Sequence, residues 1–115
     1  SQNDLLKEKV IQVHDEVMPK IGELKTSQKK LNEMAENLEQ SDELEDAEKA
    51  TELKAVAADC GNAYDEMFVW MRQFDPNLED MSEEQAKTYL EEQLEKVGEV
   101  KKDILQALEK SQKLL

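Results

Sequence analysis

The stretch LKAVAADCGNAYDEMFVWMRQF, from Leu53 to Phe74, indicates the fold of this chain more directly than any other. Its apolar residues recur at steps of three and four, the spacing that keeps side chains on one face of an α-helix. One column consists of Leu53, Val56, Cys60, Ala63, Met67, Trp70 and Phe74, and a second consists of Ala57, Tyr64 and Met71. A single partner helix would need only a narrow seam, so two columns predict two neighbouring helices around a shared core.

Helices with the same spacing are predicted on both sides of this stretch. The apolar positions from Leu6 to Leu38 follow steps of three and four, and so do those from Leu90 to Leu115. Pro19 lies inside the first helix, where its ring and its missing N–H predict a kink near residues 15 to 19. We therefore expect helices at about 4–38, 43–74 and 83–114, which form a single domain over residues 1–115.

The two turns between the helices carry different signals. Pro76 ends the second helix, because proline disfavours helical geometry in the preceding Asp75 and cannot donate a backbone hydrogen bond. The segment 82–85, Ser-Glu-Glu-Gln, then predicts a capping box for the third helix. For the first turn the signal is Asp42 as a helix cap, with no glycine or proline to enforce a reversal. An unbroken long helix, assembled into a coiled-coil oligomer, is the structural alternative there.

These features predict an all-α fold, an antiparallel three-helix bundle of long helices in up-down-up order. Reversals near residues 40 and 78 also determine which residues share a level along the bundle. Gly22, Gly61 and Gly98 fall within about one turn of each other. They either form a layer where the helices approach closely or share a level by chance.

The net charge of −13 excludes several classes of partner. Binding to nucleic acid or to anionic lipid headgroups relies on clustered lysine and arginine, so no nucleic-acid partner is expected. The acidic residues gather in two stretches, Glu36 to Glu52 and Asp75 to Glu95, each with eight carboxylates and one lysine. Each stretch is either a solvated face that keeps the protein soluble or a surface for a cation or a basic partner.

Few residues suit catalysis or cofactor binding. The chain has one histidine, His14, and one cysteine, Cys60, which excludes an internal disulfide and the two Glu-x-x-His pairs of di-iron bundles. It has no glycine-rich phosphate loop and no EF-hand pattern. The carboxylate pairs are expected on outward positions, where their pKa values would not suit acid or base catalysis. We therefore expect a protein that is not an enzyme and that holds no cofactor.

The register predicts one dense cluster, which consists of His14, Met67, Trp70, Phe74 and Tyr89, with Met18 and Met71 beside it. Methionine at helical spacing commonly fills gaps in a core, and aromatic side chains close the end of a bundle. Imidazole and thioether groups also suit Cu(I). The alternative interpretation is therefore a copper site with the ligands His14, Met18, Met67 and Met71.

Two segments, VHDEVMPKIGEL (Val13 to Leu24) and AYDEMFVWMRQF (Ala63 to Phe74), followed by a helix ending KKDILQALEKSQKLL, resemble a family of small bacterial lipoproteins often labelled viral A-type inclusion protein. The resemblance covers most of the chain and lies mainly in HDEVMPK and WM-x-x-F. It implies a domain held in the periplasm or at the cell surface by a lipidated N-terminal cysteine, and it implies no particular biochemical activity. Ile21 and Phe68 depart from the family, where methionine is expected.

The sequence and this resemblance together give an expectation for function. We expect a non-catalytic helical-bundle domain, the soluble part of a cell-envelope lipoprotein, which acts in protein interaction or envelope structure with an unidentified protein partner. Contact with a membrane is expected only through a lipid anchor absent from this chain, and the protein is expected to be a monomer or a weak dimer. Copper binding and coiled-coil oligomerisation stay open as alternatives.

Overall fold

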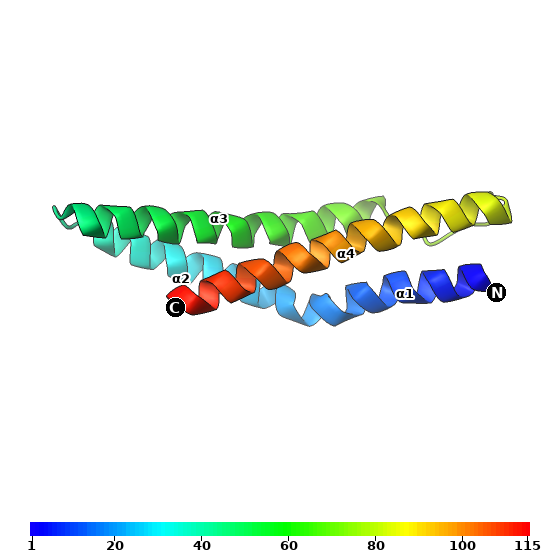
Figure 1. Cartoon of the computed structure of the whole chain (residues 1–115), viewed down its shortest axis with the longest axis horizontal. Helices are drawn as coiled ribbons and strands as arrows, with labels where there is room; N and C mark the ends of the chain where they lie inside the picture. Colours follow the sequence, from blue (N-terminus) through cyan, green and yellow to red (C-terminus); the bar gives the residue numbers. More distant parts are fainter.

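A computed structural model describes residues 1–115 and consists of long helices joined by short connections. The helices are α1 (Gln2–Val17), α2 (Ile21–Glu39), α3 (Leu44–Gln73) and α4 (Glu83–Leu114), with a 3-10 turn, η1 (Met18–Lys20), between α1 and α2. In Figure 1, α3 and α4 run in opposite directions, and α1 and α2 together form the third leg. The prediction of an all-α antiparallel three-helix bundle is confirmed, although the helix expected over residues 4–38 is divided into α1 and α2.

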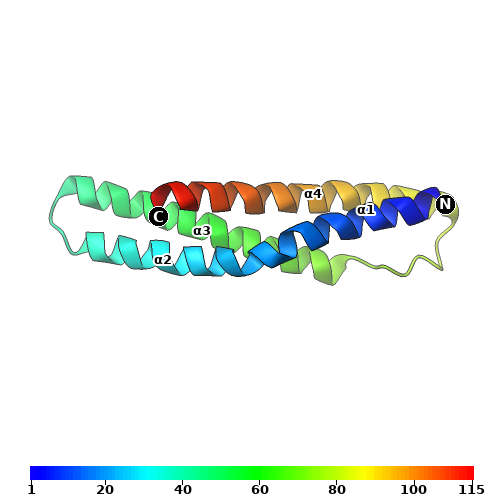
Figure 2. The same cartoon turned by 90° about the horizontal axis from the view of Figure 1, so that it is seen from below.

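The bundle is long and staggered, with extents of 63, 18 and 16 Å. α2 packs along α3, α1 packs along α4, and α3 crosses α4 in the middle, as Figures 1 and 2 show. The hairpin of α2 and α3 extends past the C-terminal end of α4. Three helices therefore share the core only in the central part of the molecule. No helix combines the length and the apolar composition that a membrane span needs.

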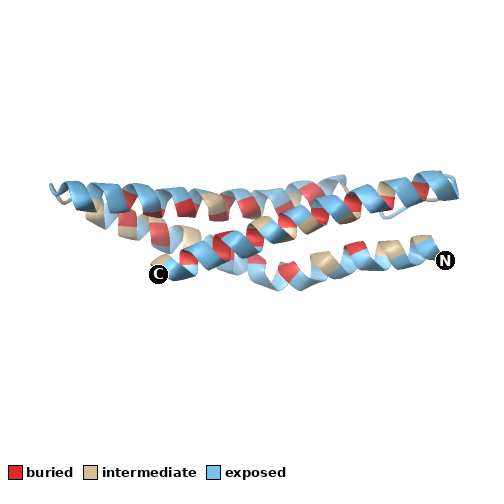
Figure 3. Cartoon of the chain, viewed as in Figure 1, coloured by how far each residue is buried: buried red, intermediate tan, exposed pale blue.

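The core is a continuous row of buried side chains along the inner faces of the helices (Figure 3). The predicted column in α3 is buried from Leu53 to Trp70, and Phe74 at its end is half-buried. The largest fully enclosed side chains are Leu24, Leu31, Leu53, Met67, Leu90 and Ile104. Burying a side chain of this size stabilises a protein by about 1.5–3 kcal/mol, so these contacts hold the helices together despite the net negative charge.

The 3-10 turn η1 contains Pro19. Proline lacks the N–H that an α-helix would use, and its ring crowds the carbonyl of the residue four positions earlier. The tighter 3-10 turn accommodates the proline, while Val17 and Ile21 on either side of it stay buried in the core. The chain thereby passes from α1, which packs on α4, to α2, which packs mainly on α3.

The turn between α3 and α4 forms as predicted. α3 ends at Gln73, ahead of Pro76, and Ser82 makes the predicted capping box with Gln85 at the start of α4. Within the loop, side-chain oxygens of Asp75 and Asn77 each accept a hydrogen bond from the backbone N–H two residues further on. Such local hydrogen bonds fix the loop without a glycine.

The start of α3 differs from the prediction, because Asp42 does not cap it. The helix begins at Leu44, and its N-cap is Glu43, which makes no side-chain capping hydrogen bond. In this turn the Oγ of Ser41 accepts a hydrogen bond of 3.1 Å from the N–H of Glu43. Asp42 is exposed. The chain reverses here, so the alternative of one unbroken helix through residue 40 is wrong for the folded chain.

The glycine layer does not form. A Cβ added to Gly22 or Gly98 would meet nothing within 4 Å, so no helix approaches closely at either residue. Gly61 alone lies at a close contact, where a Cβ would be 2.5 Å from Nε2 of Gln28. A shared level along the axis does not determine which face of a helix a residue occupies, and these three residues occupy faces with different surroundings.

Candidate functional site

The structure brings together the aromatic side chains that the sequence placed near one another. Trp70 stacks on Phe74 with 5.0 Å between ring centroids, and Phe74 stacks on Tyr89 at 6.2 Å. The ring of His14 lies 6.2 Å from that of Trp70. Met67, one turn before Trp70, is fully enclosed. Met67 and Trp70 therefore belong to the core, and His14, Phe74 and Tyr89 are half-buried beside them.

The four candidate copper ligands lie in different environments. Nδ1 of His14 lies 3.0 Å from Oδ1 of Asp15, and Met67 is enclosed in the core. Met18 and Met71 are partly buried against the same core. No group of three or more histidine, cysteine, aspartate or glutamate side chains is arranged to hold a metal ion. Copper binding through His14 and the methionines stays a prediction.

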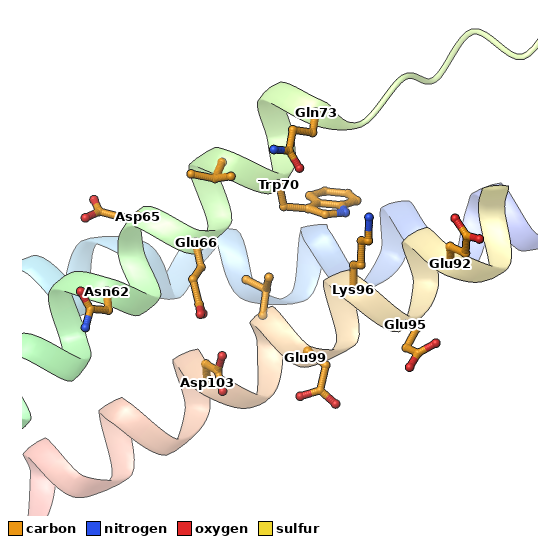
Figure 4. A pocket seen from close by; sticks show the side chains of 12 residues that line it. Asn62, Asp65, Glu66, Trp70, Gln73, Glu92, Glu95, Lys96, Glu99 and Asp103 are labelled. Carbon is orange, nitrogen blue, oxygen red and sulfur yellow. The ribbon is translucent and has the colours of Figure 1, made fainter.

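A groove between α3 and α4 lies beside the aromatic cluster (Figure 4). Its volume is about 840 Å³, and each helix contributes six of its lining residues. Those on α3 are Asn62, Asp65, Glu66, Val69, Trp70 and Gln73, and those on α4 are Glu92, Glu95, Lys96, Glu99, Val100 and Asp103. We call this feature the α3–α4 groove.

The α3–α4 groove combines an apolar floor with an acidic rim. Val69, Trp70 and Val100 are its apolar residues, and Val69 is 41% exposed to solvent. Six carboxylates and one amine, that of Lys96, surround them. An exposed apolar surface with a polar rim is the usual composition of a binding site.

The indole of Trp70 is held in a fixed orientation. Its Nε1 donates a buried hydrogen bond of 2.9 Å to Oε1 of Gln93 on α4, and Phe74 stacks against it from the same helix. Gln93 is the one buried glutamine in the chain, and its amide is satisfied by this contact. The floor of the groove is therefore formed before any ligand arrives.

Glu66 of α3 faces Asp103 of α4 across the groove (Figure 4). Partial burial, a hydrogen bond with Asp103 and repulsion from its charge raise the pKa of Glu66 to about 7, with burial as the largest cause. Two carboxyl groups can hydrogen-bond to each other only when one of them carries a proton. The pair therefore shares a proton below pH 7 and repels itself above it.

A smaller hollow of about 240 Å³ continues beyond this pair and shares the side chains of Asn62, Glu66 and Asp103 with the groove. It ends at an ion pair between Asp59 of α3 and Lys110 of α4, in which Nζ lies 3.5 Å from Oδ2. The Glu66 and Asp103 pair thus separates the acidic groove from the next part of the α3–α4 contact, where the ion pair of Asp59 and Lys110 joins the two helices.

Cys60 is unsuited to nucleophilic chemistry. Its side chain is fully enclosed, and its Sγ lies 3.8 Å from the carbonyl oxygen of Ala107, to which it can donate. Burial raises the pKa of the Cys60 thiol, and the charge of Asp59 acts in the same direction, although a hydrogen bond with Ser111 opposes them. The thiolate, which is the reactive form, is therefore disfavoured.

The sequence reasoning missed the α3–α4 groove. The expected outward positions of Glu92 and Glu95 are confirmed, since both are exposed, but that they border a groove was not foreseen, and neither was the Glu66 and Asp103 pair. The sequence did carry a signal for this groove. Asn62, Glu66 and Gln73 are spaced by four and seven residues, so they form a polar row on α3 beside its apolar column. A polar row beside a core column marks the edge of a helix contact.

No family model, no curated protein and no solved structure matches the chain. The resemblance to the lipoprotein family accordingly stays a prediction.

Proposed function

We propose that this protein is a non-catalytic interaction domain that binds its partner in the α3–α4 groove. The observation that carries the proposal is the apolar floor of the groove, where Val69 is 41% exposed beside the largely buried Trp70 and Val100, and which no other element of the chain covers. In Figure 4 the ribbons of α1 and α2 lie behind the floor and leave the mouth open. Apolar surface that is exposed between polar rims is typical of a surface awaiting a partner.

Preorganisation supports the same proposal. The hydrogen bond to Gln93 and the stacking with Phe74 fix Trp70 before binding. Binding then costs little conformational entropy in this protein, which favours affinity. Aromatic side chains fixed in this way commonly contribute most of the binding energy of an interface.

The lining of the groove lacks the nucleophile and base of a serine or cysteine hydrolase. It contains no serine, threonine, cysteine or histidine, so it has no hydroxyl or thiol nucleophile and no imidazole base to activate one. The carboxylates of Glu66 and Asp103 face each other and share a proton between themselves. Binding is therefore the function that these residues support best.

The proposal extends to location. The resemblance in Val13 to Leu24 and Ala63 to Phe74 supports a domain that a lipid anchor displays in the periplasm or at the cell surface. There it would act in protein interaction or in envelope structure. Metabolic labelling of the full-length protein with an alkyne fatty acid, combined with cell fractionation, tests this part. An unlabelled protein in the cytoplasmic fraction would contradict it.

Ligand mapping by nuclear magnetic resonance tests the groove itself. The ¹⁵N-labelled protein is titrated with a panel of neutral, acidic and basic peptides and small molecules, and shifted amide signals are assigned to residues. We expect shifts in Val69, Val100 and the indole N–H of Trp70, the only tryptophan of the chain. Val69→Arg should abolish them. Leu105→Arg, which changes an equally exposed residue (40%) outside the groove, should not. A panel that shifts no groove signal contradicts the proposal.

A further inference from the structure

The dimensions of the α3–α4 groove suit a helix. Its lining spans residues 62–73 of α3 and 92–103 of α4, which at 1.5 Å per residue is about 16 Å, or three turns. The groove lies between two antiparallel helices on the side away from α1 and α2 (Figure 4). This is the position that a fourth helix would occupy in a four-helix bundle.

The apolar floor suits one face of such a helix. Val69, Trp70 and Val100 lie in the middle of the groove, with polar residues on both sides. An amphipathic helix that enters a groove presents apolar side chains at spacings of three, four and seven residues. Its apolar stripe would therefore meet the floor, and its flanking residues would meet the rim.

The charges of the rim determine the sign of the partner. The six rim carboxylates form no ion pair within the chain, and neither does Lys96. Three helix contacts outside the groove are bridged by an ion pair: Glu16 with Lys101 between α1 and α4, Glu39 with Lys54 between α2 and α3, and Asp59 with Lys110 between α3 and α4. The carboxylates of the α3–α4 groove therefore have no counter-charge within the chain.

We infer that the occupant of the groove is a basic amphipathic helix of a partner protein, whose apolar stripe packs on Val69, Trp70 and Val100 and whose lysine or arginine side chains pair with the rim. This inference rests on the proposed function. A second copy of this chain does not fit, because both copies carry a net charge of −13. A small polycation could pair with the rim, but it would leave the apolar floor exposed to water.

Four synthetic probes separate these possibilities. The first is an amphipathic leucine and lysine peptide of 18 residues, and the second is a scrambled peptide of the same composition with no apolar face. The third replaces every lysine of the first with glutamate, and the fourth is spermine. None contains tryptophan, so the fluorescence of Trp70 reports binding, while amide shifts locate it and circular dichroism measures helix formation in the peptide.

We expect the amphipathic basic peptide to bind at least ten times more tightly than the other three probes and to become helical. Its affinity should fall as salt is raised, because salt screens exposed charges. Glu95→Lys should weaken binding about fivefold, the size expected for an exposed charge pair. Glu91→Lys, one turn away on the same helix and outside the groove, carries the same change of net charge and should weaken it less than twofold.

The other outcomes overturn the inference in distinguishable ways. Equal binding of the scrambled peptide or of spermine would show that charge suffices and that no helix is recognised. Groove shifts with the acidic peptide alone would reverse the sign of the partner and leave the proposed function intact. Shifts outside the groove, or equal effects of Glu95→Lys and Glu91→Lys, would remove the groove as the site. If no probe of the larger panel shifts a groove signal either, the proposed function fails as well.

Discussion

Trp70 of α3 and Gln93 of α4 are joined by a hydrogen bond that is buried on both sides, since each residue is only 6% exposed. No buried side-chain nitrogen or oxygen in the chain lacks a hydrogen-bond partner. Apolar contacts tolerate sliding between helices, whereas a hydrogen bond fixes both distance and direction. This pair therefore sets the register of α3 against α4 at the groove.

Gln93→Leu tests this relationship. The substitution leaves the indole N–H of Trp70 buried without an acceptor, which should lower the free energy of unfolding by about 1–3 kcal/mol. Urea denaturation measures the change. Gln106→Leu, at an exposed position of the same helix, is the matched control and should have little effect. In the double variant with Gln93→Leu and Trp70→Phe, the loss of stability should be smaller than the sum of the two single losses, because no donor then remains unpaired. Additive losses would contradict a direct coupling.

Stability should depend on pH through Glu66. Its pKa is raised from 4.5 to about 7 in the folded protein, so between these values the folded state binds more protons than the unfolded state. The free energy of unfolding therefore falls as the pH rises from about 4.5 to 7, and this contribution is constant above that range. Because water reaches the pair, the fall should be smaller than for an enclosed pair.

Glu66→Gln should remove this dependence and stabilise the protein at pH 8, since a neutral amide can donate to Asp103 without repulsion. Urea denaturation at several pH values from 4 to 8 gives the profile. Asp65→Asn removes an equal charge from the neighbouring residue of the groove and serves as the control. Parallel profiles for the wild-type protein and Glu66→Gln would show that the carboxyl pair does not govern the pH response.

Substitution of Gly98 and of Gly61 by alanine should change stability differently, because the space around the two glycines differs. Gly98 lies in the middle of α4 with open space around it, so Gly98→Ala should stabilise the protein by about 0.5–1 kcal/mol through higher helix propensity. Gly61→Ala should gain less, because its Cβ would displace the side chain of Gln28. Gln28→Ala in the same protein should restore the gain. Thermal unfolding ranks the variants, and a larger gain at Gly61 than at Gly98 would contradict the packing.

The hydroxyl of Tyr89 should hold the start of the loop after α3. It accepts a hydrogen bond of 2.7 Å from the backbone N–H of Asp75. Tyr89→Phe keeps the ring and should cost about 0.5–1.5 kcal/mol of stability. It should also speed hydrogen exchange at the Asp75 amide. Tyr64→Phe, at a tyrosine whose hydroxyl forms no hydrogen bond within the chain, is the control. Unchanged exchange at Asp75 would show that the loop is held by its other contacts.

Local chemistry explains what could be predicted from the sequence. The apolar spacing of Leu53 to Phe74 determined the faces of α3, and Pro76 with the Ser82 capping box determined one turn. Each of these signals acts over a few residues. The capping role assigned to Asp42 was wrong because α3 begins one residue later than that role requires, after the N-cap Glu43, and the hydroxyl of Ser41 bonds the N–H of Glu43 in the turn.

The groove could not be predicted because it depends on contacts that are not made. Glu66 and Asp103 lie on different helices, and they meet only because α3 crosses α4 at one particular register. The passage of the chain at η1 moves α2 toward α3 and leaves α1 against α4, so no third helix covers the opposite seam. Periodicity identifies the buried face of a helix, but it does not say how far two neighbouring faces stand apart.

The tip where α2 turns into α3 extends beyond α4, so only two helices build it. Its length is therefore independent of the rest of the molecule. Seven residues inserted in α2 and matched by seven in α3 would carry the turn outward by about 10 Å and keep the same faces paired. The molecule can therefore be lengthened at this arm by whole heptads, while the α3–α4 groove keeps its position and its lining.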